Sequence, residues 1–169
     1  MSINLFFVLT LGLLLGMYGY FTPATPPGKE VREVPQIQLY SFTLYEVSRK
    51  GIDHLLEGEE GKKFEERYEI TSAKFSDNTK SMFQSVRADT ARYQNDVVVL
   101  ESNVLYQRSD GLEFRSNEGK YDTKASLITT KGPFVITQHG NRVDGTRLHY
   151  NTEQDTVSAD EVRGSYQLN

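Results

Sequence analysis

The chain has 169 residues, a hydrophobic content of 37% and a formal net charge of −4 at pH 7. This length and composition suffice for one core of ordinary size, so a single folded domain is expected. Basic residues are interspersed with acidic ones, which argues against a nucleic-acid partner because no basic stripe can neutralise a phosphate backbone. The absence of cysteine excludes disulfides, thiolate nucleophiles and cysteine-based zinc sites.

Residues 1–21 are predicted to form a transmembrane anchor. The stretch Ile3–Phe21 carries no charged residue, and at roughly 1.5 Å per residue its helix would span close to the ~30 Å hydrocarbon core of a bilayer. The alternative is a cleaved signal peptide, whose apolar core is usually only about 7 to 15 residues long. Gly12, Gly16 and Gly19 form a ridge of small residues, where another membrane helix can pack closely.

Residues 22–34 are predicted to be a proline-rich spacer. Pro23, Pro26 and Pro27 follow the apolar run directly, and proline ends a helix because it lacks the backbone donor and fixes φ. An extended, semi-rigid segment is expected there. The folded domain is predicted to cover residues 35–169.

The periodicity of this domain is two, which is typical of strands. Apolar and charged residues alternate over Phe64–Ile70 and over Gly111–Ser116. Pairs such as Asp110-Gly111 and Asp144-Gly145 predict tight hairpins, so neighbouring strands should be antiparallel. The charge-dense stretch 57–66 contains two glycines, each of which costs roughly 1 kcal/mol in a helix interior, so a turn is predicted there.

One motif occurs three times, as RYQNDVVVL from Arg92, KYDTKASLI from Lys120 and HYNTEQDTV from His149. Its tyrosines, Tyr93, Tyr121 and Tyr150, give a period of 28 to 29 residues. Each unit is predicted to comprise two or three short strands that cannot bury an apolar face alone. Stacked units share an interior, and the two end strands keep unpaired backbone groups that can accept another strand.

One face of the stacked units is predicted to be apolar. In the strand around Ser102, alternation places the apolar residues on one side if the chain bends there without leaving register. The interior is then either a tightly packed core or, where the two layers stay open along one edge, a trough for an acyl chain. The residues assigned to this lipid-binding face are Val98, Leu100, Val104, Tyr106, Leu112, Phe114, Ile128, Phe134, Ile136, Leu148 and Tyr150.

The sequence offers little for catalysis. His54, His139 and His149 are too scattered for a zinc site, and no serine lies in a nucleophile-elbow motif. We therefore expect no enzymatic activity, no metal site and no cofactor.

Several short motifs of the domain carry a resemblance to a known family. They are A-D-x-A-x-Y from Ala88, L-x-S-x-V from Leu100, Y-D at Tyr121, G-P-F-V-I from Gly132 and D-G-T-R-L-x-Y from Asp144. With the membrane span and the spacer, they resemble the LptC family of lipopolysaccharide export proteins and the wider OstA-like group. The resemblance implies an all-β fold, a twisted antiparallel β-jellyroll preceded by one N-terminal transmembrane helix. Ser102 departs from the pattern, because such repeats often have glycine there.

The resemblance also implies a place in the cell envelope of a Gram-negative bacterium. The chain would be a single-pass inner-membrane protein with a cytoplasmic N-terminus and a periplasmic domain. It would receive lipopolysaccharide from an inner-membrane ABC transporter, against which the membrane helix packs, and pass it to a periplasmic bridge protein of similar fold.

Two regions are implied in docking, near residues 36–45 for the transporter and near residues 157–168 for the bridge protein. Gly145, Val162 and Tyr166 are assigned to docking and assembly. The alternative function is a membrane-tethered protein-interaction scaffold that has no lipid-binding trough.

Overall fold

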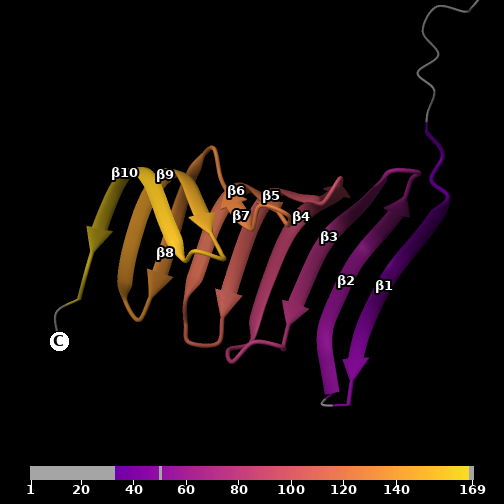
Figure 1. Ribbon diagram of the computed structural model, residues 1–169, viewed down its shortest axis with the longest axis horizontal. Helices are drawn as coiled ribbons and strands as arrows, with labels where there is room; N and C mark the ends of the chain where they lie inside the picture. Colours follow the sequence, from indigo (N-terminus) through magenta and orange to yellow (C-terminus); the bar gives the residue numbers. More distant parts are fainter. Residues whose placement is uncertain (1–32, 50, 168–169) are drawn as a thin grey trace, which may run out of the picture. The chain divides into compact units, whose positions relative to one another are not determined.

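The computed structural model describes residues 33–49 and 51–167, and this part of the chain is an antiparallel β-structure (Figure 1). The all-β prediction is confirmed. Residues Val34–Asn169 form one compact unit, whereas the predicted membrane anchor and most of the spacer lie outside the described residues. The strands are β1 Ile37–Ser48, β2 Gly51–Lys63, β3 Arg67–Asp77, β4 Gln84–Gln94, β5 Val97–Arg108, β6 Glu113–Asp122, β7 Leu127–Thr129, β8 Pro133–Gln138, β9 Asn141–Asn151 and β10 Thr156–Ser165.

The strands follow one another across one sheet in the order β1-β2-β3-β4-β5-β6-β7-β9-β10. Figure 1 shows this succession from β1 at the right to β10 at the left. Strand β6 pairs with β7 through Lys120–Asp122 and with β8 through Glu113–Ser116. Both pairings are antiparallel, so β7 and β8 act as one strand interrupted at residues 130–132.

A line of bends crosses the sheet through the middle of its strands. Ser41 in β1, Ser72 in β3, Ser102 in β5, Arg147 in β9 and Glu161 in β10 all have positive φ. Such residues bend a strand as a β-bulge does, and two successive side chains then point outward. In β3 and β9 the alternation shifts at the bend, so Ile70 and Ala73, and likewise Gly145 and Leu148, lie on the concave face on either side of it. The sheet folds over itself in the manner of a jellyroll.

The two halves of the folded sheet face each other. Tyr150, in one half of the sheet, interacts electrostatically with Tyr106 and Arg108, which lie in the other half. The buried apolar residues gather beside the bends, as Ala73, Ala88, Val104 and Phe134 show. Among the described residues no side chain is less than 2% exposed. The interior is therefore thin and not a filled core throughout.

The turn predicted over residues 57–66 is wrong, because β2 continues to Lys63. The two glycines of this stretch leave space for one aromatic ring from the neighbouring strand. A Cβ on Gly58 or on Gly61 would lie 2.7 Å from Cε1 of Phe42. Phe64, predicted to begin the next strand, lies instead in the connection before β3, where the Arg67 guanidinium stacks 4.0 Å from its ring centroid.

The structure also corrects the predicted geometry of β5. Ser102 does bend the strand, but Asn103 has positive φ as well, and the register to β6 shifts between Glu101 and Val104. Ser102 and Asn103 of β5 face the single residue Asn117 of β6, so β5 carries one extra residue at this bend. Leu100 and Val104 nevertheless both lie on the concave face.

The glycine pocket for Phe42 predicts a stability effect. We expect Gly58→Ala to lower the free energy of unfolding by about 1 to 3 kcal/mol, the usual cost of overpacking, because the new methyl group would displace both Phe42 and Ile70. Urea denaturation measures this change. Gly132→Ala is the matched control, since a Cβ at Gly132 meets nothing within 4 Å. Equal losses of unfolding free energy in both variants would contradict the close packing of Phe42 against Gly58.

Candidate functional site

An apolar row crosses the concave face in the half of the sheet that contains the β1–β2 turn. Directly paired residues in neighbouring strands lie on the same face of a sheet, so the pairings define the row. Its members are Leu44, Leu56, Phe75, Val86, Tyr106, Phe114, Ile136 and Val143. The concave face thus carries apolar side chains on all the long strands from β1 to β9.

A second row, rich in tyrosine, crosses the opposite half. Tyr68, Tyr93, Val98, Tyr121, Ile128, Tyr150 and Val157 are successive cross-strand partners. The three tyrosines of the sequence repeat therefore occupy equivalent places in one row. The two rows lie on the facing halves and form the two long sides of the interior.

The structure places ten of the eleven residues predicted for the apolar face in strands, with their side chains on the concave side. Val104, Phe134 and Leu148 are buried, and the other eight are half-buried. Leu112 is the exception in position, because it lies in the connection before β6, where its amide is 3.4 Å from the Asp110 carboxylate. Binding of lipid by these residues stays a prediction.

The concave face is open at the β1–β3 end. A cleft of about 220 Å³ is lined there by Leu44, Tyr45, Glu46, His54, Leu56 and Phe75. Leu44 and Phe75 keep 51% and 39% of their surface exposed, although both point into the interior. Toward β5–β9 the same face is closed over Val104, Phe134 and Leu148. The interior is therefore a trough with an uncovered end, which we call the trough hereafter.

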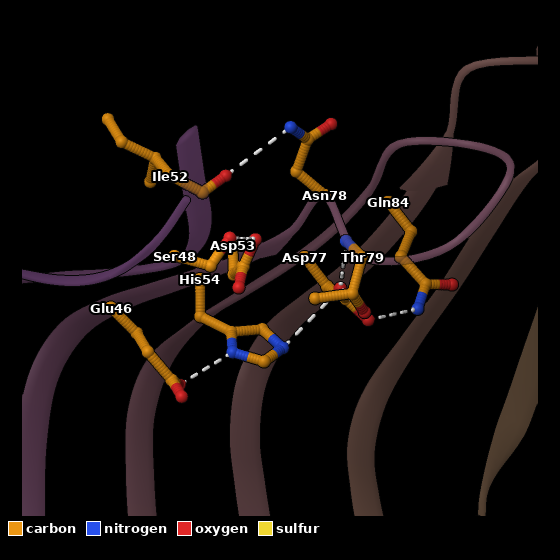
Figure 2. Close-up of polar contacts among 9 residues, drawn as sticks. All are labelled: Glu46, Ser48, Ile52, Asp53, His54, Asp77, Asn78, Thr79 and Gln84. Carbon is orange, nitrogen blue, oxygen red and sulfur yellow. Dashed lines mark hydrogen bonds and ion pairs between the residues drawn. The ribbon is translucent and has the colours of Figure 1, made fainter. Parts of the chain in front are cut away.

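A polar cluster, whose contacts are drawn in Figure 2, lies on the same face as the trough. Its members Glu46, His54 and Asp77 are each two residues away from the apolar row in their strands. The ring of His54 is 2.7 Å from Glu46 of β1 and 3.4 Å from Asp77 of β3, and it stacks on Phe75 with 5.5 Å between centroids. Asp77 also accepts bonds from Thr79 and Gln84. The cluster ties the edge strand β1 to β2, β3 and β4.

The electrostatics of the cluster follow from these contacts. The hydrogen bond to Glu46 raises the pKa of His54, with the negative charges of Asp77 and Asp53 acting in the same direction against partial burial. Burial of Asp77 by itself raises its pKa, but the bonds from Thr79 and Gln84, together with His54, lower it overall. The two carboxylates therefore favour the protonated form of His54 more than water does for a free imidazole.

This arrangement predicts a pH dependence. Because the folded pKa of His54 lies above its ordinary value of 6.5, its contribution to stability is complete below about pH 6.5 and is lost as the pH rises through the folded value. We expect the melting temperature to fall between about pH 6 and pH 8 more in the wild-type chain than in His54→Gln. His149→Gln, an exposed residue of β9, is the control and should behave as wild type. A pH profile unchanged by His54→Gln would contradict a stabilising role of the His54 contacts with Glu46 and Asp77.

A second polar group borders the trough at β4–β6. The Tyr106 hydroxyl donates to Gln84 at 2.8 Å. The Arg108 guanidinium binds both oxygens of Asp110, and it lowers the pKa of that carboxyl to about 2. Asp110 also accepts a bond from Gln138 of β8 at 3.0 Å. These bonds satisfy the polar groups near the trough and hold the β5–β6 connection to β8.

The described residues contain no group of three or more histidine or carboxylate side chains placed so that they could hold a metal ion, and no helix long and apolar enough to cross a membrane. The predicted membrane span, with Gly12, Gly16 and Gly19, lies outside the described residues.

Comparison with known proteins now adds to this geometry. A family model described as lipopolysaccharide-assembly, LptC-related, matches residues 5–167. The chain belongs to this family. The resemblance stated from the sequence motifs is therefore confirmed, and the LptC-related protein is a component of lipopolysaccharide assembly and transport.

A solved structure of similar fold supports the architecture of this LptC-related chain. It is LptH of Pseudomonas aeruginosa, described as the LptA-homologous periplasmic component of the conserved lipopolysaccharide transport device. The match covers 78% of this chain and 94% of that chain, with a TM-score of 0.51 and 11% sequence identity. At this identity the likeness shows the fold alone. The comparison with curated protein sequences finds no match.

The residues assigned to docking lie near the β10 end of the LptC-related domain. Val162 and Tyr166 are 56% and 69% exposed. Gly145 is buried, and a Cβ there would lie 2.7 Å from Cζ of Phe134 and 3.2 Å from the Asp160 carbonyl oxygen. A larger residue would therefore disturb both the core and the pairing of β9 with β10; the role of these three residues in assembly stays a prediction.

The sequence reading missed the N-terminal part of the concave face. Leu44, Leu56 and Phe75 line the open end of the trough, yet the predicted face began only at Val98. The turn wrongly predicted over 57–66 hid the β1–β2 hairpin. Alternation of Phe42 and Leu44 within the β1 sequence is the signal that could have located it.

Proposed function

We propose that this LptC-related protein carries lipopolysaccharide by sheltering its acyl chains in the trough. The observation that supports the proposal is the uncovered apolar end formed by Leu44, Leu56 and Phe75. Exposed apolar surface in a concave site is the usual mark of a binding groove. The cross-strand row continues from there to β9, so a chain that enters at this end meets apolar side chains along the sheet.

The energetics require no chemical step in this chain. Burial of an alkyl chain is favourable by about 0.8 kcal/mol per CH₂. Transfer onward then needs comparable shelter in the next protein, and the direction of transport must be supplied by ATP hydrolysis in the transporter. The protein accordingly acts as a carrier and not as an enzyme.

The two edges of the sheet can each bind one partner protein, as a carrier between two proteins requires. Strand β1 pairs only with β2, and β10 only with β9, among the described strands. Each edge has free backbone groups that can accept a strand from another protein. In this proposal the β1 edge meets the inner-membrane ABC transporter and the β10 edge meets the periplasmic bridge protein. The anchor at residues 1–21 holds the domain at the periplasmic side of the inner membrane.

Photo-crosslinking in cells that produce lipopolysaccharide tests this function. A photoreactive residue at Leu44 of the full-length chain, inside the trough, is expected to capture lipopolysaccharide during transport. The same residue at the neighbouring position Thr43, which points to the outer face, is the matched control and should capture none.

A protein-interaction scaffold is the competing function, and the exposed apolar residues Val157, Val162 and Tyr166 near the β10 edge are the observation in its favour. A scaffold without lipid binding would give protein crosslinks near β10 and no lipopolysaccharide at Leu44. Capture at Leu44 is therefore the result that separates the two functions.

A further inference from the structure

The tyrosine row contains two exposed rings that neither the core nor the polar cluster uses. Tyr68 of β3 and Tyr93 of β4 are cross-strand partners and keep 45% and 40% of their surface exposed. Their ring centroids lie 6.2 Å apart and the ring planes are tilted by 46°. They lie one step beyond Ile70 and Ala91 on the concave face, at the lip of the trough opposite the His54 cluster.

The Tyr93 hydroxyl is already bonded, and Lys63 Nζ lies over the Tyr68 ring, 5.7 Å from its centroid. The exposed parts of the two ring faces are therefore the surface that is left for a ligand. The Tyr93 hydroxyl donates to Asp96 at 3.2 Å, and Lys124 holds the other oxygen of Asp96 at 2.7 Å. Tyr150, in the same row, is tied in the same way to Asp155 at 3.0 Å. A bond at the hydroxyl fixes the ring in place, so its exposed face is preorganised for a flat, weakly polar partner.

Resting on the proposed function, we propose that Tyr68 and Tyr93 form a saccharide-stacking platform for the sugar head of the glycolipid whose chains occupy the trough. One face of a sugar ring presents C–H groups, which are attracted to the negative face of an aromatic ring. The hydroxyls of the sugar then point to water and to the polar turns around the platform. A fatty acid has no such face, so the platform adds affinity only for ligands that carry sugar.

The position of the platform fits this occupant. The apolar row and the tyrosine row lie on facing halves of the folded sheet. A glycolipid with its acyl chains in the trough therefore places its sugar head at one of the two long edges, or lips, of the trough. The opposite lip carries Glu46 and Asp77, which already bind His54. The lip that carries Tyr68 and Tyr93 therefore offers exposed aromatic surface that suits a sugar ring. Tyr121 and Tyr150 continue the tyrosine row along the sheet.

The test compares two probes on the full-length chain in mild detergent. The probes are lipid A, which carries a sugar head, and a fluorescent fatty acid, which does not. Tyr93→Leu keeps apolar bulk but removes the aromatic face, and it is expected to weaken lipid A binding about tenfold, or about 1.4 kcal/mol, with fatty-acid binding unchanged. Tyr93→Phe keeps the ring and is expected to bind lipid A as the wild type does. Tyr68→Leu repeats the measurement at the second ring.

Two results would overturn the platform. Equal effects on both probes in both leucine variants would show that the tyrosines serve the fold or the trough only. A loss in Tyr93→Phe as large as that in Tyr93→Leu would show that the hydroxyl, and not the ring face, matters. If the wild-type chain binds neither probe, the proposed function itself is wrong and the platform falls with it, so the two failures are distinguishable.

Discussion

Phe134→Ala is expected to lower the free energy of unfolding by about 3 to 5 kcal/mol, the usual cost of removing a buried phenyl group. Phe134 is only 3% exposed and stacks on Phe114 with 5.9 Å between ring centroids. Its ring also fills the space beside Gly145, which has no side chain that could occupy the cavity left by the substitution. A loss of this size is a large part of the 5 to 15 kcal/mol that is typical of a folded domain.

Urea denaturation followed by circular dichroism measures this loss. The matched control is Phe83→Ala, because Phe83 is the same residue type but is 47% exposed in the connection before β4. The control is expected to lose less than about 1 kcal/mol, as surface substitutions usually do. Similar losses in the two variants would mean that the closed end of the interior is not the core of the domain.

Phe75→Asp is expected to have the largest effect on ligand binding. Phe75 lines the open end of the trough between Leu56 and Val86. An ionised carboxylate there would have to lose its hydration to let an alkyl chain pass, which is costly. We expect at least a roughly tenfold weaker affinity for a fluorescent fatty acid, equivalent to about 1.4 kcal/mol.

Fluorescence titration measures this affinity. Ser81→Asp introduces the same charge in the exposed β3–β4 connection, and it should bind as the wild type does. Phe75→Leu keeps an apolar side chain and should retain most of the affinity. Unchanged binding in Phe75→Asp, with the fold intact by circular dichroism, would place the ligand elsewhere.

The strand pattern and the repeat were readable from sequence because they depend on local alternation. Tyr93, Tyr121 and Tyr150 repeat at nearly equal intervals, and the structure places them in one cross-strand row. Strict alternation fails at the bends of β3 and β9, where two successive residues point outward, whereas in β5 two residues face one residue of β6. Ser102 was recognised as a bend, but the sequence could not show that Asn103 adopts positive φ as well.

The open end of the trough was harder to predict for two physical reasons. Glycine has little preference for strands, so Gly58 and Gly61 predict a turn, whereas in the structure they leave room for the ring of Phe42. Glu46 and His54 are cross-strand partners beside a register shift between Glu46 and Val47, and no local sequence pattern specifies that shift. Which part of a curved sheet stays uncovered depends on such long-range contacts.

The central claim is that acyl chains enter the trough and do not bind the outer face. The chain contains no cysteine, so single cysteines can be placed at Leu55 and Leu56, which are adjacent but point to opposite faces. An environment-sensitive fluorophore is attached to each cysteine in the full-length protein. The shift of its emission on addition of lipid A tests the claim directly. We predict a blue shift at position 56 and none at position 55; equal shifts at both positions, or no shift at position 56, would contradict it.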